Sequence, residues 1–228
     1  MELLRRSIPV QPERQVSSRW AVPPGWQAEV ALILAHGAGN DMEHPFLCTV
    51  QEGLAERGRL VVSFNFPYKE AGRKAPDRAP VLEATWQAVI QAVSEDQVLA
   101  PERLVLGGKS LGGRMAAHVA ASGARCDGLV FLGYPLHPPG RPESPRTEAL
   151  TASSCLMLFV EGTRDRLCRL DQLRPLLDGL TAPTTLHEIE GGDHSFKVPA
   201  RLGRSEEAVW AEIVQVIDHW LSNALERD

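Results

Sequence analysis

The sequence predicts an α/β protein with a mostly parallel central sheet of at least six strands and helices on both faces. Short, almost purely apolar runs recur along the chain, as expected of strands that are buried on both faces. Segments with apolar residues at helical spacing lie between these runs. Strands that alternate with helices favour a parallel sheet, because each helix returns the chain to the same end of the sheet.

The expected strands are apolar runs that end near glycine, proline, asparagine or charged residues. They cover residues 30–35, 60–64, 103–106, 129–132, 155–160 and 184–189. The expected helices cover residues 44–57, 81–93, 111–122, 171–180 and 205–221. Two segments rich in proline, 69–80 and 134–146, are expected to be loops.

The 228 residues are enough for one sizeable core, and we expect a single domain over residues 1–228. Residues 1–28 form a polar, proline-containing extension that could supply an edge strand. The interval from 134 to about 151, between the fourth and fifth strands, is too short for a lid domain.

The composition limits the classes of function. Apolar residues make up 43% and charged residues 23%, which is typical of a globular protein. A net charge of -5 gives no electrostatic support for nucleic-acid binding. No apolar run reaches the roughly 20 residues of a membrane-spanning helix, and the N-terminus has no secretory signal. Four cysteines without a C-x-x-C pair favour free thiols and a cytoplasmic protein; they are Cys48, Cys126, Cys155 and Cys168.

Ser110 lies in the stretch GGKSLGG, between an expected strand and an expected helix. GKS could end a phosphate-binding loop, but that motif needs glycine at position 103, which is arginine, and residues 104–106 are apolar strand. Gly108-x-Ser110-x-Gly112 instead has the pattern of a nucleophile elbow, in which glycines relieve the crowding of a strained turn. The alternative is an ordinary tight turn in which the serine caps the helix.

A serine hydroxyl becomes a nucleophile only beside a base, and the base needs an acid that orients it. In this architecture the chain order is serine, acid, histidine. Asp165 follows the fifth expected strand and His194 follows the sixth, so they are the candidate acid and base. Glu161 and Asp171 are weaker candidates for the acid, because one lies at the strand itself and the other begins a helix.

The other histidines fit the role of base less well. His187 lies inside an expected strand, and His118 and His219 lie on expected helices. Asp193 is adjacent to His194, but neighbours in sequence rarely face the same ring edge, so we treat it as a loop residue.

Acyl transfer also needs hydrogen-bond donors for the oxyanion of the tetrahedral intermediate. The backbone N–H of Leu111, directly after the serine, is one candidate. The second is expected from the glycine-rich loop after the first strand, with Ala38 as the first choice and Gly37 as the fallback. His36 is expected to anchor this loop by hydrogen bonding, and a simple glycine turn is the alternative.

Six motifs along the chain belong together: HGAGND, FNFPY, GGKSLGGRMA, GYPLHPPGRPE, EGTRD and GGDHSF. They resemble the α/β-hydrolase superfamily, and within it the small dienelactone-hydrolase-like branch that includes the testis-expressed α/β-hydrolase-like proteins. The resemblance spans roughly residues 30–220. It implies a Ser110–Asp165–His194 triad with an oxyanion hole at Ala38 and Leu111.

Two departures from the branch bear on the substrate. Dienelactone hydrolases proper carry a cysteine nucleophile, whereas this chain has Ser110. Without a lid the site is expected to be open. An acyl pocket could be lined by Phe66, Tyr68, Tyr134 and Leu136, and Gly37 is a further expected substrate-binding residue. Ordinary loop packing is the alternative for each of the three aromatic residues.

We therefore expect a serine esterase or thioesterase that acts on a small molecule and needs neither metal nor organic cofactor. Nucleic acid and membrane are not expected partners, and the oligomeric state is left open. Lys109, Arg114 and Arg164 near the site could favour an anionic substrate. Two alternatives remain: a non-catalytic binding or scaffold module with the same fold, as some relatives are, and a peptidase, which usually carries an additional gating domain.

Overall fold

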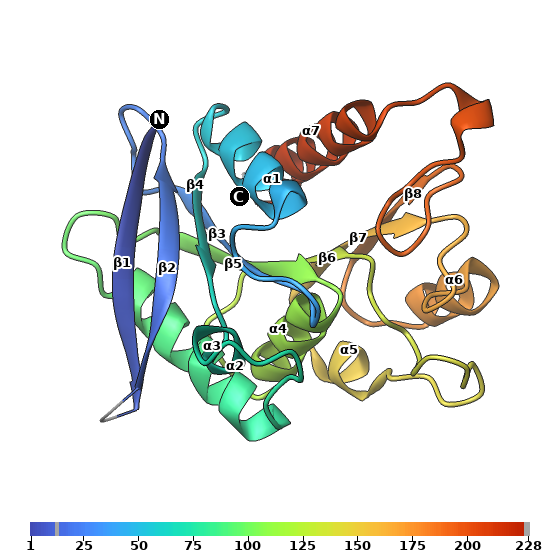
Figure 1. The fold of residues 1–228 in the computed structure, drawn as a ribbon, viewed down its shortest axis with the longest axis horizontal. Helices are drawn as coiled ribbons and strands as arrows, with labels where there is room; N and C mark the ends of the chain where they lie inside the picture. The colour runs from blue at the N-terminus through green and yellow to red at the C-terminus, as the bar shows by residue number, and fades with distance from the viewer. Residues whose placement is uncertain (12–13, 226–228) are drawn as a thin grey trace.

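The computed structural model describes residues 1–11 and 14–225 and contains one eight-stranded sheet (Figure 1). The strand order is β1-β2-β4-β3-β5-β6-β7-β8, and the six strands from β4 to β8 in this order are parallel. Their bounds are β3 Val30–Ala35, β4 Leu60–Phe64, β5 Arg103–Lys109, β6 Gly128–Leu132, β7 Leu156–Gly162 and β8 Thr184–Ile189. All six were predicted, and the α/β class is confirmed.

The N-terminal extension contributes two strands rather than one edge strand. β1 (Glu2–Gln11) pairs antiparallel with β2 (Arg14–Val22), and β2 pairs antiparallel with β4. The signal in the sequence is weak, because polar residues stand between the buried apolar ones: Ser18 and Arg19 on β2 are buried together with Val16 and Trp20.

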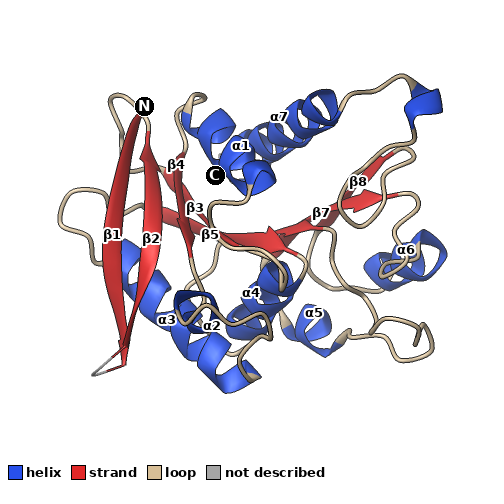
Figure 2. Cartoon of the chain, viewed as in Figure 1, coloured by secondary structure: helices blue, strands red, loops and turns tan. Residues whose placement is uncertain are grey.

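Helices cover both faces of the sheet, as predicted (Figure 2). α1 and α7 pack on one face, and α3, α4, α5 and α6 contribute to the core on the other. Their bounds are α1 Pro45–Ala55, α3 Ala79–Ser94, α4 Leu111–Ala121, α5 Glu148–Ala152, α6 Leu170–Asp178 and α7 Glu206–Leu225. Within the described residues, no helix is both long and apolar enough to span a membrane.

Three short helices were not predicted. α2 (Pro67–Glu70) occupies the start of the expected loop 69–80, and the five-residue α5 follows the loop from 134 to 146. Ala200–Leu202 form a single 3-10 turn before α7. Such short helices carry too few residues for an apolar period, so sequence patterns do not reveal them. Between β6 and β7 the chain holds only the irregular loop and α5, which leaves the carboxyl edge of the sheet without a lid domain.

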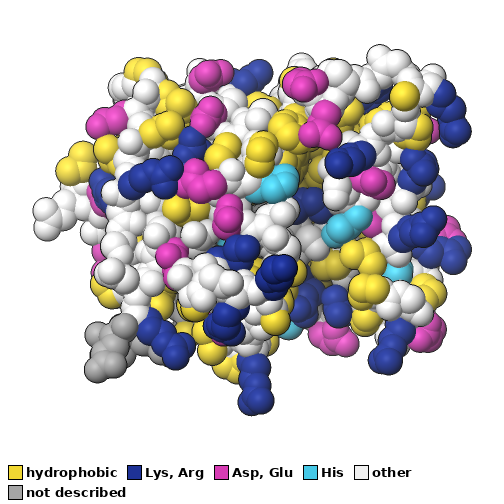
Figure 3. Space-filling model, viewed as in Figure 1, with side chains coloured by type: hydrophobic (Ala, Val, Ile, Leu, Met, Phe, Trp, Pro, Cys, Tyr) yellow, Lys and Arg dark blue, Asp and Glu magenta, His cyan; other side chains and the backbone are white. Residues whose placement is uncertain are grey.

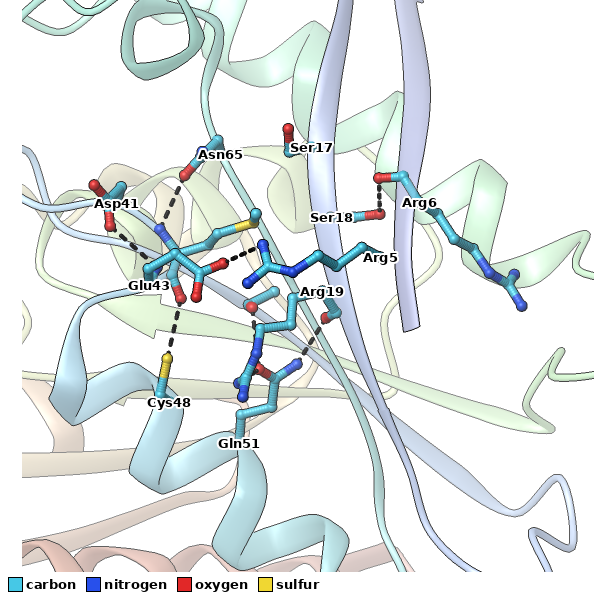
Figure 4. A network of polar contacts seen from close by, with 12 residues as sticks. Arg5, Arg6, Ser17, Ser18, Arg19, Asp41, Glu43, Cys48, Gln51 and Asn65 are labelled. Carbon is cyan, nitrogen blue, oxygen red and sulfur yellow. Dashed lines mark hydrogen bonds and ion pairs between the residues drawn. The ribbon is translucent and has the colours of Figure 1, made fainter. Parts of the chain in front are cut away.

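Polar contacts tie the N-terminal hairpin to the segment that follows β3 (Figure 4). Arg5 forms an ion pair with Glu43 at 2.8 Å, and the buried Arg19 bonds the side chain of Gln51 on α1. The Asn65 side chain accepts the backbone N–H of Met42 at 2.9 Å. These contacts hold the segment between β3 and α1, which lies beside the candidate site, against two separate parts of the sheet.

Candidate active site

Ser110 occupies a strained turn between β5 and α4. Its φ of 52° and ψ of -112° lie in a region that residues with a side chain rarely adopt. A Cβ atom on Gly108 or on Gly112 would lie 2.3 Å from the carbonyl oxygen of Ala35. Both glycines are therefore required for the turn to approach β3, as the spacing of the pattern predicts.

A chain of hydrogen bonds joins Ser110, His194 and Asp165. The Nε2 atom of His194 lies 2.9 Å from Ser110 Oγ, and its Nδ1 atom lies 2.6 Å from Asp165 Oδ2. The ionised carboxylate can only accept, so Nδ1 carries the proton and Nε2 is free to accept the serine proton. Asp165 Oδ1 accepts the backbone N–H of Leu167 at 2.7 Å, which fixes the carboxylate in place.

Burial differs along this chain of hydrogen bonds. The Asp165 side chain is fully buried, whereas the His194 side chain is 26% exposed. The acid is thus shielded from solvent, while the histidine and Ser110 can be reached from outside. A substrate can therefore approach Ser110 and His194, while the hydrogen bond between Asp165 and the ring is shielded from water.

The alternative acids have other partners. Glu161 Oε1 accepts the backbone N–H of Tyr134 at 2.5 Å. Asp171 is exposed and forms an ion pair with Arg169 at 2.5 Å. Asp193 caps its own loop, because its Oδ1 atom accepts the backbone N–H groups of Ser195 and Lys197. Asp165 is the acid that contacts the His194 ring.

The alternative bases lie elsewhere too. His187 contacts Glu212 at 2.7 Å, and His118 lies 3.5 Å from Glu83. His219 accepts from Asn223 one turn further along α7.

The loop after β3 passes close to the serine. A Cβ atom on Gly37 would lie 3.7 Å from the Cβ atom of Ser110. His36 is buried, donates from Nδ1 to the Gly37 carbonyl at 2.8 Å and accepts the Phe66 N–H at Nε2 at 3.2 Å. Burial lowers the pKa of His36 to about 4. His36 is therefore a neutral anchor of the loop, the role that the sequence suggested.

The predicted oxyanion donors belong to the first residue of α4 and to the loop after β3. Leu111 is the first residue of α4, where a backbone N–H has no acceptor within the helix. The Ala38 carbonyl accepts the hydroxyl of Tyr68 at 2.9 Å, which fixes the peptide groups around it. The sequence did not suggest this supporting role for Tyr68.

The three aromatic residues of the expected acyl pocket are packing residues. Phe66, Tyr68 and Tyr134 are at most 1% exposed. Phe66 packs edge-on against His36, and the Tyr134 hydroxyl donates to the Arg146 carbonyl at 3.1 Å. Burial raises the pKa of both tyrosines. These three side chains support the loops around the site through packing and hydrogen bonds.

A cavity of about 300 Å³ adjoins the site on the side of α1 and α7. Gly37, Lys109 and Ser195 line it near the serine, and Phe46 and Trp210 line it further away. In the space-filling view, histidine side chains lie on either side of a hollow near the middle of this face (Figure 3). Gly37 is the residue of the expected substrate pocket that lines this cavity.

The fold and this arrangement of residues define the class of protein. A family profile described as alpha/beta hydrolase domain matches residues 28–222, and the chain belongs to the α/β-hydrolase family. The resemblance of its motifs to this superfamily is thereby confirmed, and the protein has an α/β-hydrolase fold without a lid domain.

Solved structures of other proteins have a similar fold over almost the whole chain. A serine hydrolase homologue from Coxiella burnetii is 20% identical, with a TM-score of 0.75 over 97% of this chain and 98% of that one. A lidless serine hydrolase from Xanthomonas campestris is 18% identical, with a TM-score of 0.75 over 100% and 97%. A dienelactone hydrolase from Anabaena variabilis is 19% identical, with a TM-score of 0.77 over 96% of each chain.

Proposed function

We propose that this protein is a serine hydrolase that cleaves a small ester or thioester through an acyl-enzyme. One observation carries the proposal: Ser110 Oγ lies 2.9 Å from His194, whose other nitrogen lies 2.6 Å from the buried Asp165. These distances allow direct proton transfer from the serine to the histidine. The strained turn that presents Ser110 supports the same reading.

In the first half of the reaction, Ser110 Oγ attacks the carbonyl carbon while His194 Nε2 takes the hydroxyl proton. Asp165 keeps the proton on Nδ1 and stabilises the imidazolium. The N–H groups of Leu111 and Ala38 would donate to the oxyanion. As the tetrahedral intermediate collapses, His194 delivers its proton to the leaving alcohol or thiol, and the acyl group remains on Ser110.

In the second half, water attacks the acyl-enzyme with His194 again as base. Collapse of the second intermediate returns the proton to Ser110 Oγ and releases the carboxylic acid. The site's own residues supply every proton transfer in this sequence. One of the similar structures is named a dienelactone hydrolase, and a lactone is a cyclic ester, which supports an ester substrate. The absence of a lid domain over the site supports a small ester as substrate.

The test is labelling with a fluorophosphonate, followed by peptide mass mapping and a screen of short-chain esters and thioesters. Wild type should be labelled at Ser110 and should hydrolyse at least one ester. Ser110→Ala should lose both properties. Ser195→Ala is the matched control, because Ser195 is exposed directly beside His194. A folded wild type that neither labels nor hydrolyses would favour a binding module instead.

A further inference from the structure

A buried ammonium group lies near His194, and the proposed reaction does not use it. Lys109 is the last residue of β5, and its Nζ atom is buried without a hydrogen-bond partner among the described residues. A Cβ atom on Gly133 would lie 2.7 Å from this Nζ and 3.5 Å from His194 Nδ1. The two nitrogens are therefore no more than 6.2 Å apart.

The absence of a side chain at position 133 makes room for this approach. Gly133 follows β6 with a φ of 67° and pairs its N–H with the Val160 carbonyl of β7. The ammonium also lies over the ring of Phe196, with Nζ 5.3 Å from the ring centroid. Lys109 thus spans the end of β6 beneath the loop that carries His194, and its charge faces the protein interior.

Two carboxylates are buried in the same place. Glu161 has no exposed surface and Asp165 is 5% exposed. The Oε2 atom of Glu161 has no hydrogen-bond partner among the described residues. Burial, followed by repulsion from Asp165, raises the pKa of Glu161 well above its usual range. Glu161 is therefore held in its neutral form, and Asp165 is the buried carboxylate whose charge a nearby cation can offset.

The carboxyl groups that face Lys109 come from three segments of the chain. Glu161 lies on β7, Asp165 on the loop after it, and Asp193 on the loop after β8. Burial lowers the pKa of Lys109 to about 8, so the ammonium is mostly charged at pH 7. Cys168 faces Glu161 as a neutral thiol whose pKa is raised by burial.

The charge of Lys109 is costly at this place. A buried ammonium without hydrogen bonds is disfavoured, and methionine would fill the same space without that cost. The ammonium is also withdrawn from the surface, so it does not act as the exposed attractor of anionic substrates that the sequence suggested. The property that lysine has and methionine lacks at position 109 is a positive charge near Asp165 and His194.

We propose that Lys109 is a positioning residue whose ammonium group holds Asp165 ionised and keeps His194 unprotonated before Ser110 attacks. The effect of Lys109 on catalysis rests on the proposed function as a serine hydrolase. The effect of Lys109 on the protonation of His194 does not, because a cation beside an imidazole disfavours the imidazolium whether or not a substrate reacts.

The test is an NMR titration of the histidine ring protons, with the His194 signals assigned through a His194→Asn variant. Lys109→Met should move the pH midpoint of the His194 titration upward by on the order of one unit, about a tenfold tighter binding of the proton. Lys109→Gln, a second neutral variant, should do the same. Lys197→Met is the matched control, since Lys197 lines the same cavity but is exposed, and it should leave the midpoint in place.

An unchanged or lowered midpoint in folded Lys109→Met or Lys109→Gln would overturn the proposal. In the ester assay, the acidic limb of the kcat/KM profile should move upward in parallel with the NMR midpoint. A wild type that hydrolyses no ester, together with an upward NMR shift, would overturn the serine hydrolase and leave the role of Lys109 standing. A merely structural lysine would change the thermal unfolding temperature and leave both pH readouts where they are.

Discussion

The hydroxyl of Tyr68 donates a hydrogen bond to the carbonyl oxygen of Ala38 at 2.9 Å, and so joins α2 to the loop that is expected to bind the oxyanion. The aromatic ring also packs against His36, at 5.8 Å between centroids. The fixed direction of the loop's peptide groups therefore depends on a side chain outside the loop, 30 residues further along the chain.

Tyr68→Phe should reduce kcat by roughly 5- to 50-fold, short of the 10²–10³ that loss of an oxyanion donor itself costs. KM should change little, because the variant loosens the loop without removing substrate contacts. The cost in the free energy of unfolding should be about 1 kcal/mol. Thr85→Val is the control, since it removes the hydroxyl that donates to Val81 at 2.8 Å on α3. If both variants lower kcat alike, Tyr68 has no specific role in the loop.

His36 should make the free energy of unfolding depend on pH. Its pKa is lowered from 6.5 to about 4 by burial, so the unfolded chain binds a proton before the folded protein does. This contribution is fully present above pH 6.5 and is lost as the pH falls toward 4, to a total of about 3 kcal/mol. Urea unfolding of wild type and His36→Gln at several pH values measures it. The difference between the two should shrink as the pH falls, and parallel curves would contradict the prediction.

Asp165→Asn should lower kcat/KM by roughly 10³- to 10⁴-fold, because the amide no longer holds the histidine proton on Nδ1. Asp193→Asn is the matched control: it is the neighbour of His194 in sequence, but its carboxylate caps the backbone of its own loop. We expect Asp193→Asn to cost less than tenfold in activity. Steady-state kinetics on one ester with both variants decides which aspartate orients the histidine, and equal losses would remove the assignment of Asp165.

Gly112→Ala should prevent stable folding of the turn. The added Cβ would lie 2.3 Å from the Ala35 carbonyl oxygen and 2.8 Å from that of His36, both rigid backbone atoms. We expect a loss of more than about 4 kcal/mol in the free energy of unfolding. Gly39→Ala is the control, because an added Cβ there meets no atom within 4 Å. Thermal unfolding compares them, and a Gly112→Ala protein as stable as Gly39→Ala would show that the close approach is not needed.

Much of the candidate site could be predicted from the sequence, because strand ends and glycines leave local signals. Ser110, Asp165 and His194 each follow an apolar run, and parallel strands bring their carboxyl ends to one edge of the sheet. Their separations of 84 and 29 residues along the chain close to hydrogen-bond distance only through that sheet. The order of the strands and helices could therefore be predicted from the sequence, whereas the distances between the three side chains could not.

The sequence did not predict how deeply three aromatic residues near the site are buried. Phe66, Tyr68 and Tyr134 lie in loops near the site, and loop position made them candidates for an acyl pocket. The structure buries all three: the hydroxyls of both tyrosines donate to backbone carbonyls of other segments, and the Phe66 ring packs against His36. Which side of a loop faces the substrate depends on contacts between distant segments, and no local period encodes it.

By itself, the sequence determined the alternation of strands and helices, the elbow around Ser110 and the order of the candidate acid and base, because each depends on residues near one another in the chain. The tertiary structure decided the N-terminal hairpin, the support of Ala38 by Tyr68 and the burial of Lys109 beside Glu161 and Asp165. Those features depend on which distant surfaces pack together, and burial then decides what a charge or a hydroxyl does there.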